Sequence, residues 1–356
     1  MVEAIHGRGA AVNPVNRFET LEYEVDPDVD PDDAPAPETV FLRDHSKSII
    51  AYNDSPDVGF DASVNAYRGC EHGCIYCYAR PTHEYLGFSS GLDFETKIMV
   101  KEDAPELLRQ ELSNPKWQPQ VLAMSGVTDC YQPAEKKRQL TRRCLEVLLE
   151  FRNPVVIVTK NYLVTRDIDI FRDLAHYHCV GVTISLTTLD PKLCSLMEPR
   201  ASSPARRLAA IRALAEAGIP VGYLQAPMIP GLTDSEAPAI ARAAAEAGAT
   251  FAGYVALRLP FAVKSLFEHW LEQHFPERKE NILNRIRSMR GGKLNNPNFK
   301  SRMRGEGIFA QQMAELFQLA CKKAGINKRW PELTTNNFRR PGTSQLSLFE
   351  SESLNL

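Results

Sequence analysis

The middle of the chain repeats a unit made of one short apolar run followed by a longer segment with apolar residues at helical spacing. The apolar runs predict strands and the longer segments predict amphipathic helices, two of which end at Gly218 and Gly248. We expect six main strands, at residues 62–67, 121–124, 154–159, 180–186, 219–225 and 250–257, with a short extra one at 48–51. We expect helices at residues 134–150, 167–176, 204–217 and 235–247, and one that starts near Tyr76.

Six strand–helix units of this spacing predict an α/β fold with a parallel sheet. Six strands are too few to close an eight-stranded barrel, so we expect the sheet to be open. We assign this domain to residues 45–260. In such folds ligands bind at the carboxyl ends of the strands, and the polar clusters of this chain follow its predicted strands.

The two flanks of this domain carry opposite charge. Residues 1–44 hold three arginines against eleven acidic residues, a net charge of −8, and are rich in proline. We expect this segment to be mostly disordered. Residues 276–340 hold fifteen Lys or Arg against five Glu, a net charge of +10. We expect residues 261–340 to be a basic helical extension, with helices at 262–273, 277–289 and 308–324, whose charge is either a face for a polyanion or a solvated surface.

The whole-chain composition describes a globular protein. Of its 356 residues 44% are hydrophobic, which supports a core, and the mean hydropathy is −0.29. No apolar run is long enough to cross a bilayer, so we expect no membrane association. The stretch from Met1 to Ala4 lacks the features of a signal peptide. We therefore expect a cytoplasmic protein with reduced cysteines.

Three cysteines lie within eight residues directly after the first predicted strand. Cys70, Cys74 and Cys77 have the spacing C-x3-C-x2-C. Thiolates select zinc or iron–sulfur clusters, and three of them suit a four-iron cluster with one iron left open. The glycines at 69 and 73 allow the loop to wrap closely around a bulky centre. A structural zinc site would need a fourth ligand, and His72 is the candidate for that alternative.

This motif, with Tyr76 directly before its last cysteine, resembles that of the radical S-adenosylmethionine (SAM) superfamily. The resemblance implies an open (β/α)6 partial TIM barrel, a [4Fe–4S] cluster on Cys70, Cys74 and Cys77, and SAM bound to the fourth iron. It implies that SAM is cleaved reductively to a 5′-deoxyadenosyl radical. An electron donor such as flavodoxin or ferredoxin would then be a partner.

Lys160 directly follows a buried apolar run, and a lysine there is a suitable cation for the SAM carboxylate. The chain further resembles an uncharacterised bacterial group related to spore photoproduct lyase, through the motifs around Cys70, Thr128-Asp129, Lys160, Met197-Glu198-Pro199 and Gln225-Ala226-Pro227. The resemblance implies that SAM is contacted by the following residues: Tyr76, Thr128, Asp129, Lys160, Ser185, Glu198, Arg200 and Ala226. For Glu198 and Arg200 a loop ion pair is the alternative.

One position departs from the lyase pattern. The lyase has a cysteine that returns a hydrogen atom to its product, and the corresponding position here is Gly126. Cys130 could take that role, although a small buried side chain is the alternative. Tyr78 and Tyr131 are the other candidate donors.

The tail, residues 341–356, contains a short apolar motif after a Pro-Gly break. Gln345, Leu346, Leu348 and Phe349 resemble the bacterial sliding-clamp binding pentapeptide, although a tail packed on its own domain is the alternative. In the basic region Lys300, Arg302 and Arg304 are candidate phosphate contacts.

Together these features predict a radical SAM enzyme that acts on DNA, as in lesion repair. The alternatives are a radical SAM enzyme of RNA or peptide, and a non-catalytic iron–sulfur or zinc protein that binds nucleic acid.

Overall fold

The computed structural model describes residues 5–18, 38–327 and 329–341. The strands are β1 (Val40–Arg43), β2 (Ile50–Tyr52), β3 (Ala62–Val64), β4 (Tyr67–Arg68), β5 (Lys97–Val100), β6 (Leu122–Met124), β7 (Val155–Thr159), β8 (Val180–Ser185), β9 (Val221–Met228) and β10 (Phe251–Ala256). The α-helices are α1 (Asp93–Thr96), α2 (Ala104–Ser113), α3 (Glu135–Arg138), α4 (Leu140–Phe151), α5 (Ile168–His176), α6 (Pro191–Met197), α7 (Pro204–Glu216), α8 (Ala237–Glu246), α9 (Val263–His274), α10 (Lys279–Ser288), α11 (Ser301–Arg304) and α12 (Ile308–Lys323). Four 3₁₀ helices complete them: η1 (Arg80–Leu86), η2 (Tyr162–Asp167), η3 (Asp234–Glu236) and η4 (Pro276–Arg278).

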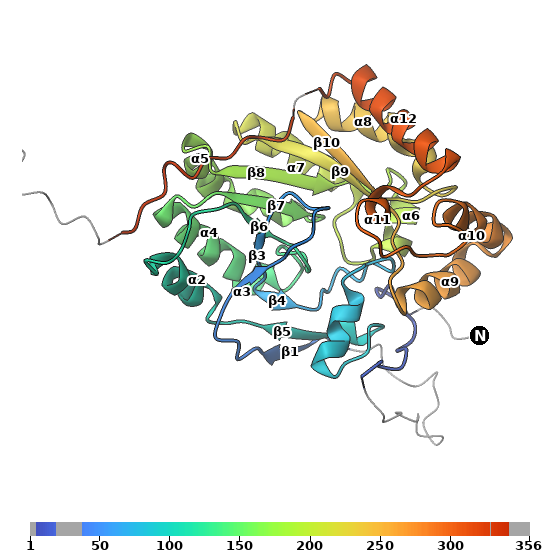
Figure 1. The fold of residues 1–356 in the computed structure, drawn as a ribbon, viewed down its shortest axis with the longest axis horizontal. Coiled ribbons are helices and arrows are strands. Elements are labelled where there is room, and N and C mark those ends of the chain that lie inside the picture. Colours follow the sequence, from blue (N-terminus) through green and yellow to red (C-terminus); the bar gives the residue numbers. More distant parts are fainter. Residues whose placement is uncertain (1–4, 19–37, 328, 342–356) are drawn as a thin grey trace, which may run out of the picture.

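The main sheet confirms the predicted α/β architecture. Among the described residues it has seven strands in the order β10-β9-β8-β7-β6-β3-β2. The six predicted strands pair in parallel and in chain order, and β2 adds an antiparallel edge. Figure 1 shows the strands stacked from β10 at the top to β3 near the centre, with helices along the outer side. The sheet has two ends and does not close, as expected for a (β/α)6 partial barrel.

Alternation of strand and helix follows from burial. Every residue of the central strand β8 is buried, as expected for a parallel strand covered on both faces. Helix α7 begins with Pro204 at its first turn, where a missing N–H costs nothing, and buries Ala210, Ile211 and Leu214 on one face. This stripe packs on the sheet and leaves the rest of the helix in solvent.

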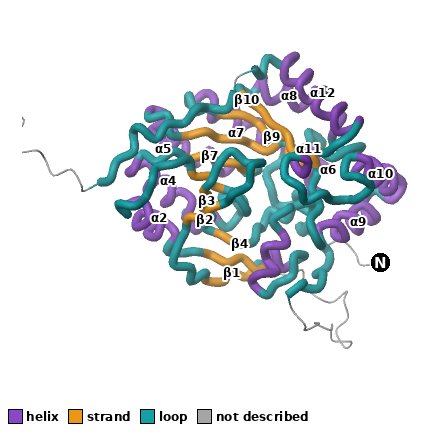
Figure 2. The backbone as a smooth tube through the Cα atoms, in the orientation of Figure 1, coloured by secondary structure: helices purple, strands orange, loops and turns teal. Residues whose placement is uncertain are grey.

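A second, three-stranded sheet in the order β1-β5-β4 was not predicted (Figure 2). The predicted strand 62–67 divides between the two sheets, because β3 belongs to the large one and β4 pairs with β5. The backbone N–H of Lys101 donates to the Ala66 carbonyl (2.9 Å) at the crossing point. The cysteine loop therefore starts from a fixed point between the two sheets.

Two helix predictions need correction. The predicted helix 134–150 is two helices, because Gln139 adopts a left-handed conformation (φ 53°) that separates α3 from α4. The helix predicted to start near Tyr76 is absent, since residues 69–79 form an irregular loop and only η1 follows them.

The prediction that residues 1–44 are mostly disordered does not hold for the described parts of that segment. Residues 38–43 lead into and form β1, and residues 5–18 pack on the body, with Ala10 fully buried. We call residues 5–18 the N-terminal strap. Composition missed it because the acidic and proline-rich positions concentrate at 19–37, which lie outside the described residues.

The C-terminal region begins with the predicted helices α9, α10 and α12, and α12 packs on α8. Residues 329–341, which we call the C-terminal belt, then cross the sheet at the amino ends of its strands. There Thr334 N–H donates to the His178 carbonyl (3.1 Å) and Arg339 N–H to the Phe151 carbonyl (2.9 Å). Arg340 reaches the Trp117 carbonyl (2.9 Å), so the described chain ends on the face opposite the strands' carboxyl ends.

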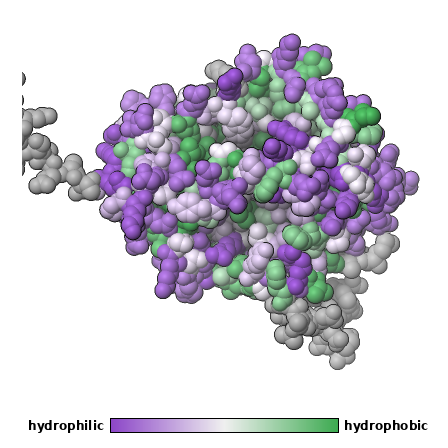
Figure 3. Space-filling model, in the orientation of Figure 1, coloured by the Kyte–Doolittle hydropathy of each residue, from purple (hydrophilic) through white to green (hydrophobic). Residues whose placement is uncertain are grey.

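The surface in Figure 3 is largely polar, with hydrophobic residues in small separate groups. Within the described ranges, no helix has both the length and the apolar character needed to cross a membrane.

Candidate SAM and cluster site

The cysteine loop is built on two left-handed glycines. Gly69 (φ 83°) begins it, and a Cβ there would lie 3.0 Å from the Phe94 carbonyl oxygen. Cys70 N–H donates to that same carbonyl (2.9 Å), which fixes the start of the loop on α1. Gly73 (φ 66°) makes the second turn, where a Cβ would lie 2.6 Å from a carboxylate oxygen of Glu95. Only glycine fits either position without a shift.

The three thiols of the loop suit a metal cluster. Cys70 and Cys74 are 7% and 8% exposed, and Cys77 is half-buried. Burial raises the pKa of the Cys74 and Cys77 thiols, so the thiolate forms need a cationic centre to stabilise them. Among the described residues, no group of three or more His, Cys, Asp or Glu is arranged to hold a single metal ion.

His72, the fourth ligand of the zinc alternative, has other partners. Its Nδ1 lies 3.3 Å from a carboxylate oxygen of Asp129, and its Nε2 lies 3.2 Å from the Asn161 side-chain nitrogen. Burial opposes the charged imidazole, but the Asp129 carboxylate and Cys70 raise its pKa to about 10. His72 therefore ties the cysteine loop to the sheet.

A buried arginine holds the loop from the outside. Arg80 is fully buried, and its guanidinium donates to the carbonyls of Cys74 (2.9 Å), Gly73 (3.1 Å) and Gly91 (2.8 Å). It also forms an ion pair with Glu95 (2.5 Å), which is fully buried as well. Fixed in this way, the backbone of residues 73–74 has little freedom to move.

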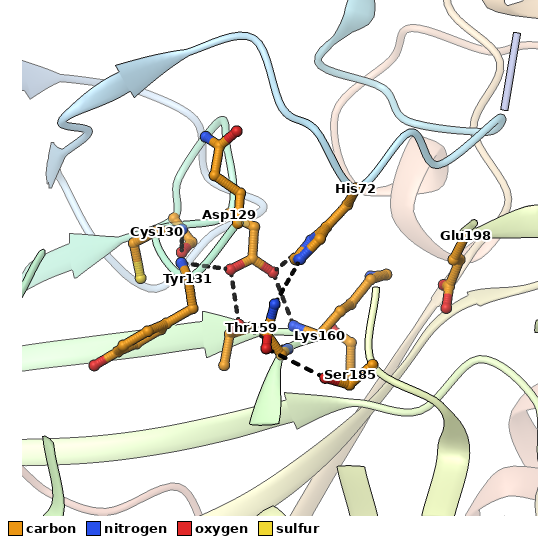
Figure 4. Close-up of polar contacts among 12 residues, drawn as sticks. His72, Asp129, Cys130, Tyr131, Thr159, Lys160, Ser185 and Glu198 are labelled. Atoms are coloured by element: carbon orange, nitrogen blue, oxygen red, sulfur yellow. Dashed lines mark hydrogen bonds and ion pairs between the residues drawn. The ribbon is translucent and has the colours of Figure 1, made fainter. Parts of the chain in front are cut away.

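Asp129 is the hub that joins the loop to the carboxyl ends of β6 and β7 (Figure 4). Its carboxylate accepts from the Thr159 hydroxyl (2.7 Å), the Lys160 N–H (2.8 Å) and the Tyr131 N–H (2.9 Å), and it pairs with His72. Burial alone would raise the pKa of Asp129, but His72 and these hydrogen bonds lower it to about 2. Asp129, predicted to contact SAM, is thus already fully engaged within the protein.

Lys160 and Ala226, both predicted to contact SAM, lie beside each other. The Lys160 ammonium lies 3.4 Å from the Ala226 carbonyl and 5.9 Å from the centre of the Tyr76 ring. Its charge acts to lower the pKa of Cys74 and Cys77, so it stands beside the cysteines. A cation next to the thiols and to a strand-end carbonyl suits a ligand with a carboxylate and an adenine.

Glu198 lies beneath Tyr76 with both carboxylate oxygens engaged. One oxygen accepts from the Tyr76 hydroxyl and from Thr187 (2.7 Å), and the other pairs with the Arg207 guanidinium. Burial raises the pKa of Glu198, against the lowering effect of Arg207. The structure thus gives Glu198 the role of holding Tyr76 in place.

Arg200 likewise has protein partners. It pairs with Glu71 (3.1 Å) and donates to the Thr39 hydroxyl (3.2 Å). For both Glu198 and Arg200 the structure matches the ion-pair alternative.

Thr128 lies in the loop after β6 and Ser185 ends β8, and both are buried. The Thr128 hydroxyl donates to the Tyr67 carbonyl (2.9 Å), and the Ser185 carbonyl accepts from Arg207 (3.1 Å). The Ser185 side chain lies close to Lys160 in Figure 4.

The candidate hydrogen donors separate into two groups. Cys130 is buried in the main hydrophobic core, on the side of Asp129 away from Lys160 and Glu198 (Figure 4). Tyr131 also points into the core, where its hydroxyl donates to Asp167 (3.0 Å). Tyr78 instead is 47% exposed, and its hydroxyl donates to the Gly126 carbonyl (2.8 Å). Tyr78 therefore lies at the mouth of the site.

Two of the three predicted DNA contacts have partners within the protein. Arg302 pairs with Asp57 (2.5 Å), and Arg304 donates to the Tyr254 carbonyl (2.9 Å). Lys300 is exposed, with its backbone N–H on Asp57 (2.5 Å). The two arginines thus anchor the basic loop. The clamp-like motif, Gln345 to Phe349, lies outside the described residues.

Sequence reasoning missed the three buried charged residues that position the loop, Arg80, Glu95 and Arg207. Arg207 carried a usable signal, because it occupies the apolar stripe of α7, three and four residues before Ala210 and Ile211. Arg80 and Glu95 carried no usable signal in the sequence, because their partners are backbone groups of the cysteine loop and of the strap, at no fixed helical spacing.

The family model of the Radical SAM superfamily matches residues 64–244. An uncharacterised protein of Mycobacterium bovis is 36% identical over 248 residues, 69% of this chain and 72% of the relative. One of Methanocaldococcus jannaschii is 32% identical over 222 residues, 62% and 79% of the two chains. The structure of spore photoproduct lyase complexed with dinucleoside spore photoproduct superposes with a TM-score of 0.57 at 16% identity, over 80% of this chain and 79% of that one.

The three thiols, the strand-end lysine and the open parallel sheet agree with these matches. The chain therefore belongs to the radical SAM superfamily, whose members use a [4Fe–4S] cluster and S-adenosylmethionine.

Proposed function

We propose that this protein is a cytoplasmic radical SAM enzyme that acts on DNA, with a damaged base as its substrate. Cys70, Cys74 and Cys77 would hold the cluster, and Lys160 would pair with the SAM carboxylate. The Ala226 backbone would contact the adenine, with Thr128 and Ser185 at the same strand ends. When bound, the cluster and SAM supply the radical chemistry, and the protein orients the substrate and excludes water.

The observation that carries a nucleic-acid substrate is the pairing of exposed rings with guanidinium groups at the mouth of the site. Arg258 lies over the Tyr78 ring (5.1 Å), and Arg302 lies over the Phe299 ring (4.4 Å). Phe299 is 52% exposed, so both rings present a face to solvent. Aromatic faces backed by arginine are the surfaces on which unpaired bases stack.

We call the surface formed by Tyr78, Arg258, Phe299 and Arg302 the rim. Its positive charge suits the binding of phosphates. Burial and the neighbouring charge of Arg302 lower the pKa of Arg258, against the raising effect of Tyr78 and Asp57. A bound phosphate would stabilise the Arg258 charge against both effects. Lys300 is exposed and adds a further cation to the segment whose backbone is held by Asp57. The likeness in fold to a lyase solved with a dinucleoside lesion supports the same substrate class.

Cys130 does not fit the role of hydrogen donor, because its thiol is enclosed in the core. Tyr78 is the better candidate, since its hydroxyl lies on Gly126, the position of the lyase cysteine. The tail motif would dock on the sliding clamp, and a flavodoxin or ferredoxin would supply the electron.

The experiment that tests this function measures SAM cleavage by the reduced, anaerobic holoprotein. Undamaged DNA, ultraviolet-irradiated DNA, RNA and no nucleic acid are compared, and 5′-deoxyadenosine and loss of lesions are quantified. We expect irradiated DNA to stimulate cleavage and to lose its lesions. Absence of cleavage under all conditions would refute the enzyme, and stimulation by RNA alone would replace DNA as the substrate.

A further inference from the structure

The N-terminal strap follows one course along the outside of the cysteine loop, α1 and η1. Its far end is held by Asn16, whose side-chain amide donates to the carbonyls of Glu84 (3.0 Å) and Phe88 (3.2 Å). Before that, Asn13 exchanges two hydrogen bonds with Asp93 (3.0 and 3.1 Å), and Pro14 accepts from the Ser89 hydroxyl (2.6 Å). These contacts are specific and run along the whole segment, so the strap is docked in one register.

The strap touches the cysteine loop at Gly9. A Cβ at Gly9 would lie 1.7 Å from the Gly73 carbonyl oxygen and 3.3 Å from the Ile75 nitrogen. No side chain fits between these two backbones. The next residue, Ala10, is fully buried in a cluster with Cys74, Ile75 and Tyr76. The strap thus packs against the loop backbone on either side of Cys74.

One buried carboxylate joins the strap to the loop. Glu95 accepts from Gly9 N–H (3.0 Å) and Ala10 N–H (2.8 Å) on the strap. The same carboxylate pairs with Arg80, which holds the carbonyls of Gly73 and Cys74. Strap, loop and α1 therefore share a single Arg–Glu pair that is out of contact with water.

We propose that the N-terminal strap is part of the cluster-binding site: it forms a wall of the pocket that holds residues 73–75 in position and keeps water and dioxygen from the Cys74 side. The C-x3-C-x2-C motif alone does not contain this wall. Because Gly9 and Ala10 supply two of the donors on Glu95, an undocked strap would leave the Arg80–Glu95 pair open to solvent and the loop free to move.

The test compares Gly9→Val with Gly59→Val. Gly59 is exposed, and a Cβ there would meet nothing within 4 Å, so the same substitution is made without a clash. Both proteins are reconstituted anaerobically, and iron per chain, visible absorbance and the rate of bleaching in air are measured. Thermal unfolding of the apoproteins, followed by far-ultraviolet circular dichroism, reports whether the body is intact.

We expect Gly9→Val to bind less iron and to bleach at least about tenfold faster than Gly59→Val, because hydrogen bonds to a charged group are lost. The unfolding curves of the two apoproteins should be similar. Equal iron content and equal bleaching rates would overturn the proposal.

If Gly9→Val does not fold, Asn16→Ala carries the test, since it loosens the far end of the strap without touching the loop. It should bleach faster than Gly59→Val, by a smaller factor than expected for Gly9→Val, and an unchanged rate would likewise overturn the proposal. These readouts are independent of the substrate, so they stand apart from the test for DNA.

Discussion

Two carboxylates near the cysteine loop, Asp129 and Glu198, each have several partners within the protein. Asp129 receives three hydrogen bonds and an ion pair, and Glu198 is shared by Tyr76, Thr187 and Arg207. Such groups are costly to bury unless every lone pair is engaged. Their engagement means that they hold Tyr76 and His72 in position beside the proposed SAM pocket.

The cysteines give the first prediction at this scale. Changing Cys70, Cys74 or Cys77 to Ala removes a proposed cluster ligand, so reconstituted protein should fall from about four irons per chain to nearly none. Iron and sulfide analysis after anaerobic reconstitution measures this. Cys321→Ala, on α12, is the control and should keep its iron. Stoichiometric zinc in the purified protein, with no iron bound, would contradict the prediction.

Lys160 gives the second prediction at the residue scale. Lys160→Ala should weaken SAM binding by about tenfold or more, since a hydrogen bond to a charged group contributes about 1.5–3 kcal/mol. Equilibrium dialysis of SAM with the reconstituted protein measures the change in Kd. Lys192→Ala, an exposed lysine on α6, should bind like the unchanged protein. Normal binding by Lys160→Ala would place the carboxylate elsewhere.

At the scale of elements, the cysteine loop is irregular and depends on its surroundings for its shape. Arg80 with Glu95 holds it from the outside, and Arg207 with Glu198 supports Tyr76 from the barrel side. Each pair joins two elements, η1 with α1 in the first and α7 with the end of α6 in the second. The loop and its supports therefore form one cooperative unit.

A matched pair of arginines on α7 tests this. Arg207→Ala leaves the Glu198 carboxylate buried without its cation, which should cost about 3–5 kcal/mol of unfolding free energy. Its neighbour Arg206 is exposed over the Tyr162 ring, so Arg206→Ala should cost about 1 kcal/mol or less. Urea unfolding of the two apoproteins decides, and equal losses would mean that the buried pair contributes no more than a surface contact.

The sequence was informative where structure is local and periodic. The six parallel strands were predicted because each is a short apolar run with a helix after it, and the cysteine motif because its spacing is short. β5 was missed because it has only four residues and pairs only in the small sheet, with β1 and β4. The break at Gln139 and the strap were missed because a left-handed residue and long-range hydrogen bonds leave no mark in the hydrophobic pattern.

At the scale of the whole molecule, the basic region meets the mouth of the site through the loop that carries Phe299 and Arg302. Arg302 pairs with Asp57 in the loop between β2 and β3, so the extension is fastened to the antiparallel edge of the main sheet. The rim therefore combines Tyr78 with residues of the C-terminal third of the chain, one of which is held by Asp57.

DNA-binding measurements on two variants should distinguish the contribution of charge at the rim from that of base stacking. Arg258→Gln should reduce the salt dependence of affinity for single-stranded DNA, with a slope smaller by about 0.7 for one lost phosphate contact. Phe299→Ala should weaken binding by about 1–3 kcal/mol and leave the slope unchanged. Fluorescence anisotropy across a salt series measures both. Trp330→Ala, a half-exposed ring on the belt, should bind normally, and an equal loss there would argue against a site at the rim.

The clamp motif can be tested with a peptide. Residues 341–356, labelled and titrated with purified bacterial sliding clamp, should bind saturably, and the Leu348→Ala/Phe349→Ala peptide should not, because both apolar anchors are gone. In the full chain the same double change should leave iron content and SAM cleavage intact. Equal binding by both peptides would remove the tail from the proposed function.

The C-terminal belt determines which way such an attachment would face. It brings Pro341 to the amino ends of the strands, beside Trp117, while the thiols lie at the opposite pole. Gln345 is four residues further on, a reach of at most about 14 Å at 3.3–3.6 Å per residue. If the tail docks on the sliding clamp, the proposed site at the carboxyl ends of the strands would face away from the clamp. The protein could then reach DNA outside the clamp, and it would have to rotate to reach the DNA within the clamp.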